Sequence, residues 1–150
     1  VYGIGPFALR RRIREVLEQF DLAGHEHDLS GAMPGGFKQR LSMAVGMLHK
    51  PEILFLDEPT SGIDPLARRM FWRRITTLSD EGTTIIITTH FMEEAEYCDR
   101  MLIQDAGHVL ALGTPAEVRE QGGHAPTMEE AFIHIVESSR AARAAEKEGA

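Results

Sequence analysis

Residues 53–64 read ILFLDEPTSGID, and this stretch decides most of what the sequence predicts about its fold. The run 53–56 is short, apolar and rich in β-branched and aromatic residues, which is typical of a strand buried on both faces of a sheet. Asp57 and Glu58 follow directly, so the strand is expected to end in two adjacent carboxylates. Such a pair is repulsive and costly to desolvate unless a cation or solvent compensates it. The stretch therefore predicts a buried strand with an acidic carboxyl end.

Helical and strand patterns alternate on either side of this stretch. Helices are predicted over residues 6–20, 36–50, 65–80, 92–98, from 115 onward, and from 128 to 137 behind a Thr127 cap. Further strands are predicted over residues 83–89, 101–104 and 108–112, the last two joined as a hairpin across 105–107. Because strands and helices alternate, the fold class is α/β with a parallel sheet, and the working end lies at the strands' carboxyl ends.

The composition excludes several classes of protein. The 150 residues are 43% hydrophobic and 26% charged, as in ordinary soluble globular proteins, and the formal charge of −7 argues against nucleic-acid binding. A single cysteine, Cys98, rules out an internal disulfide framework and suits a reducing, cytoplasmic compartment. No apolar run approaches the roughly 20 residues of a membrane span. The chain begins with Val1, which fits a segment of a longer protein.

The predicted strand 83–89 ends directly before His90. Parallel neighbours would bring Glu58 and His90 to the same edge of the sheet. Magnesium with a nucleotide phosphate is one natural compensator for the acid pair, with Asp57 in the Mg²⁺ shell and Glu58, on the other side of the strand, facing an attacking water. The alternatives are an acidic strand end before a proline turn, and a histidine that only caps a strand.

Two overlapping glycine turns precede the helix predicted over 36–50: LSGAM at 29–33 and MPGGF at 33–37. Free N–H groups and the dipole at a helix start attract phosphate, and glycines let the backbone approach it closely. Either turn could therefore bind a phosphate. The second turn has Pro34 where a hydroxyl would be useful.

The ordered series GGFKQR, ILFLDEPTSGID and IIITTH resembles the signature turn, Walker B strand, D-loop and switch histidine of ABC transporter ATPase domains. The resemblance extends over about residues 1–137. It implies a P-loop NTPase-like core: residues 1–50 would end the helical subdomain with its signature helix, 51–137 would be the C-terminal part of the core, and 138–150 a fraying helix or tail. The pattern GTPAEV followed by MEEAFIHIVE resembles the branch that exports drugs, lipids or polysaccharides.

The resemblance also separates the two glycine turns. The family's signature runs directly into a residue followed by Gln-Arg, as the second turn does, so Pro34, Gly35, Gly36 and Phe37 are the implied ATP-contacting residues. Pro34 replaces the family's serine and removes both a hydroxyl and an N–H. Phe37 replaces a glutamine, either to pack in the core or to pack on a base or sugar. The site is expected to be altered and not destroyed.

The family's chemistry gives each remaining site residue an implied role, with ATP and Mg²⁺ as cofactors. Asp57 would order Mg²⁺, Glu58 would polarise the water and His90 would sense the γ-phosphate. Ser61 and Asp64 would couple two ATP sites through the D-loop. The implied partners are a second ATPase domain, identical or different, and a transmembrane permease, which places the protein at the cytoplasmic face of a membrane.

A phosphate-cradling Gly-x-x-x-x-Gly-Lys-Ser/Thr loop is absent from the 150 residues, and no Q-loop segment is visible. Both lie upstream in the family, so the sequence is expected to be the C-terminal part of an ATPase subunit and to be inactive alone. Truncation and degeneracy both remain open. The alternatives are a degenerate partner domain, which the acid pair and His90 oppose, and a non-transport ABC ATPase, which the negative charge opposes.

Overall fold

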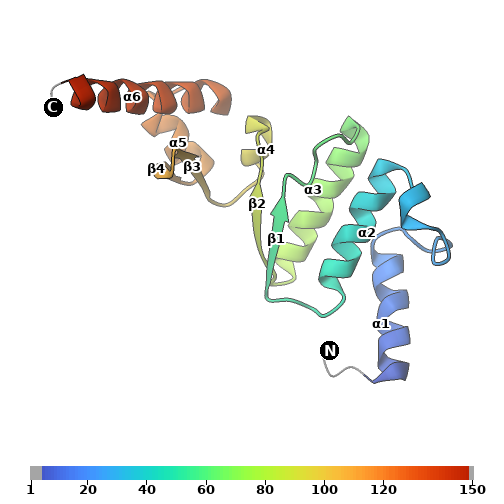
Figure 1. Cartoon of the computed structure of the whole chain (residues 1–150). Helices are drawn as coiled ribbons and strands as arrows, with labels where there is room; N and C mark the ends of the chain where they lie inside the picture. The colour runs from blue at the N-terminus through green and yellow to red at the C-terminus, as the bar shows by residue number, and fades with distance from the viewer. Residues whose placement is uncertain (1–4, 149–150) are drawn as a thin grey trace. The chain divides into compact units, whose positions relative to one another are not determined.

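A computed structural model describes residues 5–148 of the chain, which divides into two compact units, Val1–Thr88 and Thr89–Ala150 (Figure 1). The first unit contains the two-stranded parallel sheet, and the second contains a two-stranded antiparallel hairpin. The predicted α/β class with a parallel sheet is confirmed. The ends of the predicted segments, residues 1–4 and 149–150, lie outside the described residues.

The first unit follows the predicted order of elements. It contains α1 (Pro6–Gln19), a 3₁₀ turn (Ser30–Ala32), α2 (Gly35–Met47), β1 (Ile53–Asp57), α3 (Pro65–Asp80) and β2 (Thr84–Thr88). β1 and β2 pair in parallel, from Ile53 opposite Thr84 to Asp57 opposite Thr88. The two strands therefore end together, which puts their carboxyl ends at one edge.

Local sequence signals set the helix ends of this unit. Pro6 and Pro65 occupy first-turn positions, where a missing N–H costs no hydrogen bond. Asp64 caps α3, its Oδ1 accepting the N–H groups of Leu66 and Ala67 at 3.0 Å each.

At the end of α2, Arg12 of α1 donates to the carbonyl oxygens of Met47 (2.8 Å) and Leu48 (3.2 Å), which fastens α1 to α2.

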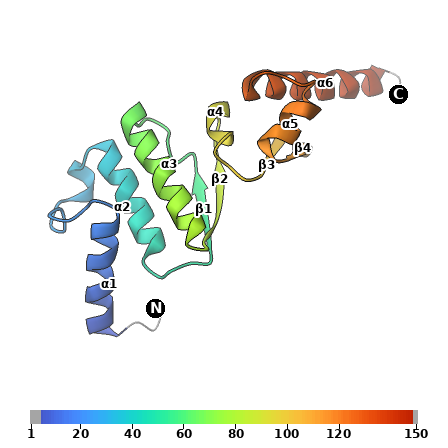
Figure 2. The ribbon, with the colours of Figure 1, turned by 180° about the vertical axis from the view of Figure 1, so that it is seen from behind.

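Only one face of the parallel sheet is covered within the first unit. α2 and α3 lie against the same side of β1 and β2 (Figures 1 and 2), and Leu54 on that side is 8% exposed and close to Gly46 of α2. On the opposite side, Ile53 is 52%, Phe55 71% and Ile86 46% exposed. The prediction that β1 is buried on both faces is therefore wrong for the described chain, because the helices of this unit reach one face only.

The second unit contains α4 (Met92–Ala95), β3 (Met101–Asp105), β4 (His108–Gly113), α5 (Pro115–Gln121) and α6 (Met128–Glu148). The predicted hairpin is confirmed. Its two-residue turn, Ala106 (φ 49°) and Gly107 (φ 81°), has the pair of positive φ angles that matches the twist of the flanking strands. α4 is shorter than predicted and ends at Ala95.

The second unit buries a core of its own, and α6 extends beyond it. The hairpin and α4 to α6 contribute the core residues Ala95, Ile103, Ala111, Val118, Met128, Ala131, Ile135 and Val136. α6 continues to Glu148, past the apolar segment that ends at 137. Asp105, at the end of β3, pairs with Arg140 (Oδ1–Nη2, 2.8 Å) and Arg143 (Oδ2–Nη2, 2.5 Å) of α6. These two ion pairs give the segment after 137 a tertiary contact.

Candidate functional site at the end of the parallel sheet

The acid pair lies at the carboxyl end of β1, beside Thr88 at the end of β2. The Thr88 hydroxyl donates to Asp57 Oδ1, and the backbone N–H of Glu58 donates to Thr88 O (3.0 Å) and Oγ1 (3.2 Å). One threonine thus holds the start of the turn that carries both carboxylates. Sequence reasoning did not select Thr88. The sequence carried no signal for it, because the pairing of Thr88 with Asp57 depends on the register of two strands that are separated along the chain.

Glu58 adopts a left-handed backbone conformation, with φ 42°. Non-glycine residues rarely do so, although Asp21, Lys50, Ala106 and His124 of this chain also have positive φ angles. β1 ends at Asp57, so the predicted alternation of strand faces does not set the direction of Glu58. The left-handed turn sets it instead, and both carboxylate side chains are exposed at the sheet edge.

The segment after the acid pair is anchored at its start and capped at its end. Thr60 is fully buried, while Ser61 is exposed and Gly62 makes a turn at φ 73°. Asp64 is exposed but uses Oδ1 as the N-cap of α3. The structure therefore gives Asp64 a helix-capping role in its own chain, and its implied role toward a second domain stays a prediction.

The second glycine turn precedes the helix directly, whereas the first forms the separate 3₁₀ turn. Pro34 is the N-cap of α2, one position before the helical start expected of a proline, and makes no side-chain capping bond. No atom lies within 4 Å of a Cβ built on Gly35, and one built on Gly36 would lie 3.9 Å from Ala67 Cβ of α3. The turn is open, and the first N–H groups of a helix have no intrahelical acceptor.

Phe37 packs within the first unit. Its ring lies 4.6 Å from the His25 ring, and the Arg40 guanidinium carbon lies 4.3 Å from its centroid. Of the two alternatives for this residue, these contacts favour packing over stacking on a base or sugar.

His90 follows β2 by two residues and belongs to the second unit. Its side chain is exposed, and its ring stacks on Phe91 with centroids 4.1 Å apart and planes inclined by 36°. The first unit thus brings together Asp57, Glu58 and Thr88, while His90 belongs to the second unit and contacts Phe91 there.

The protein ligands available for Mg²⁺ at this edge are few. Within residues 5–148, no three His, Cys, Asp or Glu side chains gather as a metal cluster. Magnesium in nucleotide sites is held by one or two carboxylates, with phosphate oxygens and water filling the other positions. The exposed carboxylates of Asp57 and Glu58 are ligands of the type and number that suit such an ion, and the assignment of Asp57 to it stays a prediction.

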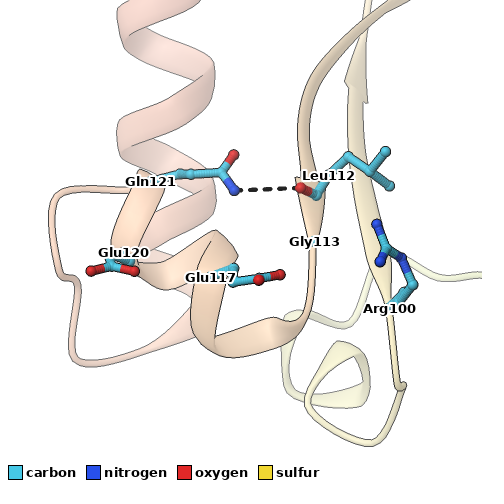
Figure 3. A pocket seen from close by; sticks show the side chains of 6 residues that line it. All are labelled: Arg100, Leu112, Gly113, Glu117, Glu120 and Gln121. Atoms are coloured by element: carbon cyan, nitrogen blue, oxygen red, sulfur yellow. Dashed lines mark hydrogen bonds between the residues drawn. The ribbon is translucent and has the colours of Figure 1, made fainter.

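The surface of residues 5–148 has at least one hollow in each unit. A hollow of about 410 Å³ lies where α1 ends beside α2 and α3, and its lining includes Gly36, Gln39, Arg40, Ile63 and Ala67. Another, of about 590 Å³ and in the second unit, is lined by Arg100, Leu112, Gly113, Glu117, Glu120 and Gln121 (Figure 3).

The hollow of the second unit is shaped by helix capping. Glu117 accepts the N–H of Thr114 at 2.8 Å, which lowers the pKa of this carboxyl, and Gln121 donates to Leu112 O at 3.4 Å (Figure 3). The side chains of Glu117 and Gln121 thus hold α5 to the end of β4. Among residues 5–148, no helix is long and apolar enough to cross a bilayer.

Curated proteins resemble the chain over most of its length. It is 45% identical over 140 residues to the probable multidrug ABC transporter ATP-binding protein YbhF of Escherichia coli K12, covering 91% of this chain and 24% of that protein. It is 40% identical over 124 residues to the daunorubicin resistance ATP-binding protein DrrA3 of Streptomyces coeruleorubidus, covering 82% of this chain and 39% of that protein. The chain thus spans between about a quarter and two fifths of these relatives.

Solved structures of ABC transporter proteins also superpose on most of this chain. The ATP-binding subunit of an ABC transporter superposes with a TM-score of 0.76 at 29% identity, covering 90% of this chain and 57% of that one. The cbiO1 protein of Clostridium perfringens, part of the ABC transporter complex cbiONQ, superposes with a TM-score of 0.65 at 27% identity, covering 78% of this chain and 50% of that one.

A family model described as "AAA domain, putative AbiEii toxin, Type IV TA system" matches residues 33–94.

Proposed function

We propose that this chain, which is homologous to part of the ABC transporter ATP-binding proteins, is the C-terminal portion of an ATP-hydrolysing subunit that energises a membrane exporter. The observation that carries the proposal is the end of β1, where Asp57 and Glu58 are held by Thr88 at the carboxyl edge of a parallel sheet. The 45% identity to a multidrug transporter ATP-binding protein supports the exporter branch.

Each carboxylate has a distinct task in this proposal. Asp57 would hold one position of Mg²⁺, which neutralises charge on phosphate oxygens when it is bound. Glu58 would accept a hydrogen bond from the attacking water and orient it, since its carboxylate is exposed and its backbone is fixed in the left-handed turn. The Thr88 hydroxyl would keep the Asp57 carboxylate in place.

The second half of the proposed site lies on a partner. The open Gly35-Gly36 turn would cap the phosphates of an ATP bound by a second ATPase domain, identical or different. Ser61 and Asp64 would couple the two sites, and His90 would contact the γ-phosphate. A transmembrane permease would complete the exporter, which places this subunit at the cytoplasmic face of the membrane. Residues 1–150 alone would not hydrolyse ATP, because they lack the phosphate-binding loop sequence.

A catalytically degenerate partner domain is the second candidate, and Pro34 is the observation that favours it. Proline supplies neither a hydroxyl nor an N–H at the start of α2, and the helix has no side-chain cap there. Such a domain would shape its companion's site and contribute no turnover of its own.

Replacement of Glu58 tests the proposal in the intact protein with its permease. Glu58→Gln should lower the rate of ATP hydrolysis by about 100-fold or more, because general base catalysis contributes about 10²–10⁴-fold. ATP binding should persist, and a dimer should accumulate with ATP. Glu52→Gln is the matched control, since Glu52 is exposed at the opposite end of β1 and should leave hydrolysis unchanged. Turnover of Glu58→Gln at the wild-type rate would refute the role of Glu58.

A further inference from the structure

Glu94 is a buried carboxylate in a molecule whose other acids mostly lie at the surface. It is 1% exposed, and the Thr89 hydroxyl donates to its Oε2 at 2.8 Å. Burial of a carboxylate costs free energy unless hydrogen bonds compensate it, so its position requires a physical reason. The proposed function gives Glu94 no task.

The same hydroxyl serves a second group. Thr89 Oγ1 accepts the backbone N–H of Phe91 at 3.1 Å while it donates its only proton to Glu94. The backbone N–H of Glu94 in turn donates to Phe91 O at 3.0 Å. Both backbone groups of Phe91 are therefore hydrogen-bonded: its N–H to the Thr89 hydroxyl, and its carbonyl oxygen to the N–H of Glu94 in the first turn of α4.

In the chain, His90 lies between Thr89 and Phe91. Its ring lies against the Phe91 ring, with centroids 4.1 Å apart and planes inclined by 36°, and Phe91 is the residue whose backbone is hydrogen-bonded to Thr89 and Glu94. The side chain of His90 is exposed, whereas the carboxylate that anchors its neighbours is buried. Hydrogen-bonded neighbours thus flank an accessible ring, as a group that must meet a ligand at a fixed angle requires.

We propose that Thr89 and Glu94 are positioning residues that hold the His90 imidazole in the orientation in which it acts on ATP. The inference rests on the proposed function, because that function gives His90 its task. Neither residue needs to touch the nucleotide. Glu94 accepts the one proton of the Thr89 hydroxyl, and the oxygen of that hydroxyl accepts the Phe91 N–H, so one hydrogen-bond chain joins the two residues to the backbone beside His90.

Thr89→Val tests this in the intact protein, since valine keeps the shape of threonine and removes the hydroxyl. We expect kcat for ATP hydrolysis to fall by about tenfold, which is about 1.4 kcal/mol of transition-state free energy, with ATP affinity unchanged. Thr89→Ser keeps the hydroxyl and should recover most of the lost activity. Thr76→Val is the matched control, because the Thr76 hydroxyl bonds the Trp72 carbonyl of its own helix and should be dispensable for kcat.

A double-mutant cycle separates positioning from a general loss of structure. In a His90→Ala background, Thr89→Val should cause no further loss of kcat, since the ring that it positions is gone. An independent loss in that background would overturn the inference. If Thr89→Val does not fold, Glu94→Gln takes its place in the cycle, with a smaller expected loss because the amide oxygen still accepts a hydrogen bond.

The imidazole itself provides a readout that does not depend on hydrolysis. The His90 ring resonances should shift or broaden in Thr89→Val and remain as in the wild type in Thr76→Val. Unchanged His90 resonances together with unchanged kcat would overturn the inference. A His90→Ala protein of full activity would instead refute the proposed role of His90, and the resonances would still report whether Thr89 orients the ring.

Discussion

Each unit buries some apolar residues of its strands and leaves others exposed, and in the second unit Leu102 (52%), Val109 (63%) and Leu112 (55%) are the exposed ones. In the second unit, Ile103 of β3 is 3% exposed beneath α5 and α6, and Val118 and Ala131 are fully buried. In the first unit, Ile53 and Phe55 of β1 are 52% and 71% exposed. Both strands read as apolar in the sequence. Apolar composition therefore predicts a strand, whereas the burial of each residue depends on which elements come within reach of its face of the sheet.

A matched pair of isoleucine substitutions should give the largest contrast between the units. Ile103→Ala should destabilise the second unit by about 3 kcal/mol, because it removes buried methylenes and leaves a cavity. Ile53→Ala should cost the first unit about 1 kcal/mol or less, since half of that side chain already faces solvent. Residue-resolved amide hydrogen exchange in α5 and α6, and separately in α2 and α3, measures both. Equal losses would mean that the exposed face of β1 is covered in solution.

Substitution of Gly122 tests how closely the end of α5 packs against α6. A Cβ at Gly122 would lie 2.6 Å from Ala131 Cα, so Gly122→Ala must push α5 away from the backbone of α6. The expected cost is about 2 kcal/mol, measured as lost hydrogen-exchange protection in α5 and α6. Gly31→Ala is the control, because no atom lies within 4 Å of its Cβ position. A Gly122→Ala protein of wild-type protection would indicate a looser core than the packing implies.

The smallest effect is expected at the contact that extends α6 beyond the core. Hydrogen bonds from Arg140 and Arg143 lower the pKa of Asp105 to about 2. An unfolded aspartate titrates near 3.9, so the folded pKa is depressed and the contact stabilises α6 fully above about pH 4. This stabilisation is lost as the pH falls through the folded pKa.

Asp105→Asn should therefore lower the protection of the α6 amides near Arg140 and Arg143 at pH 5, and the difference from the wild type should shrink as the pH approaches that folded value. Salt should weaken the wild-type contact in the same direction, because exposed ion pairs are screened. Asp80→Asn, at the exposed end of α3, is the control. If the difference in protection between Asp105→Asn and the wild type did not change with pH, packing and not charge would maintain the contact.

The candidate site was predictable in its residue types and less so in its geometry. The sequence placed Asp57 and Glu58 after a strand and selected the glycine turn that does precede α2. The left-handed backbone of Glu58 and the Thr88 hydroxyl that bonds Asp57 were not predicted. Both depend on a partner strand about 30 residues away, so no local pattern carries them.

Short sequence signals predict where several elements begin and turn. Pro65 behind an Asp64 cap, Pro115 behind a Thr114 capping box, and the hairpin turn at Ala106-Gly107 all act over a few residues. Only the tertiary structure decided which face of β1 is buried, how far α6 extends, and that Thr89 fastens Phe91 to Glu94. The two groups of features differ in how far apart along the chain the interacting residues lie. Caps and turns form bonds within a single turn of chain, whereas burial and side-chain orientation are set by elements that only folding brings together.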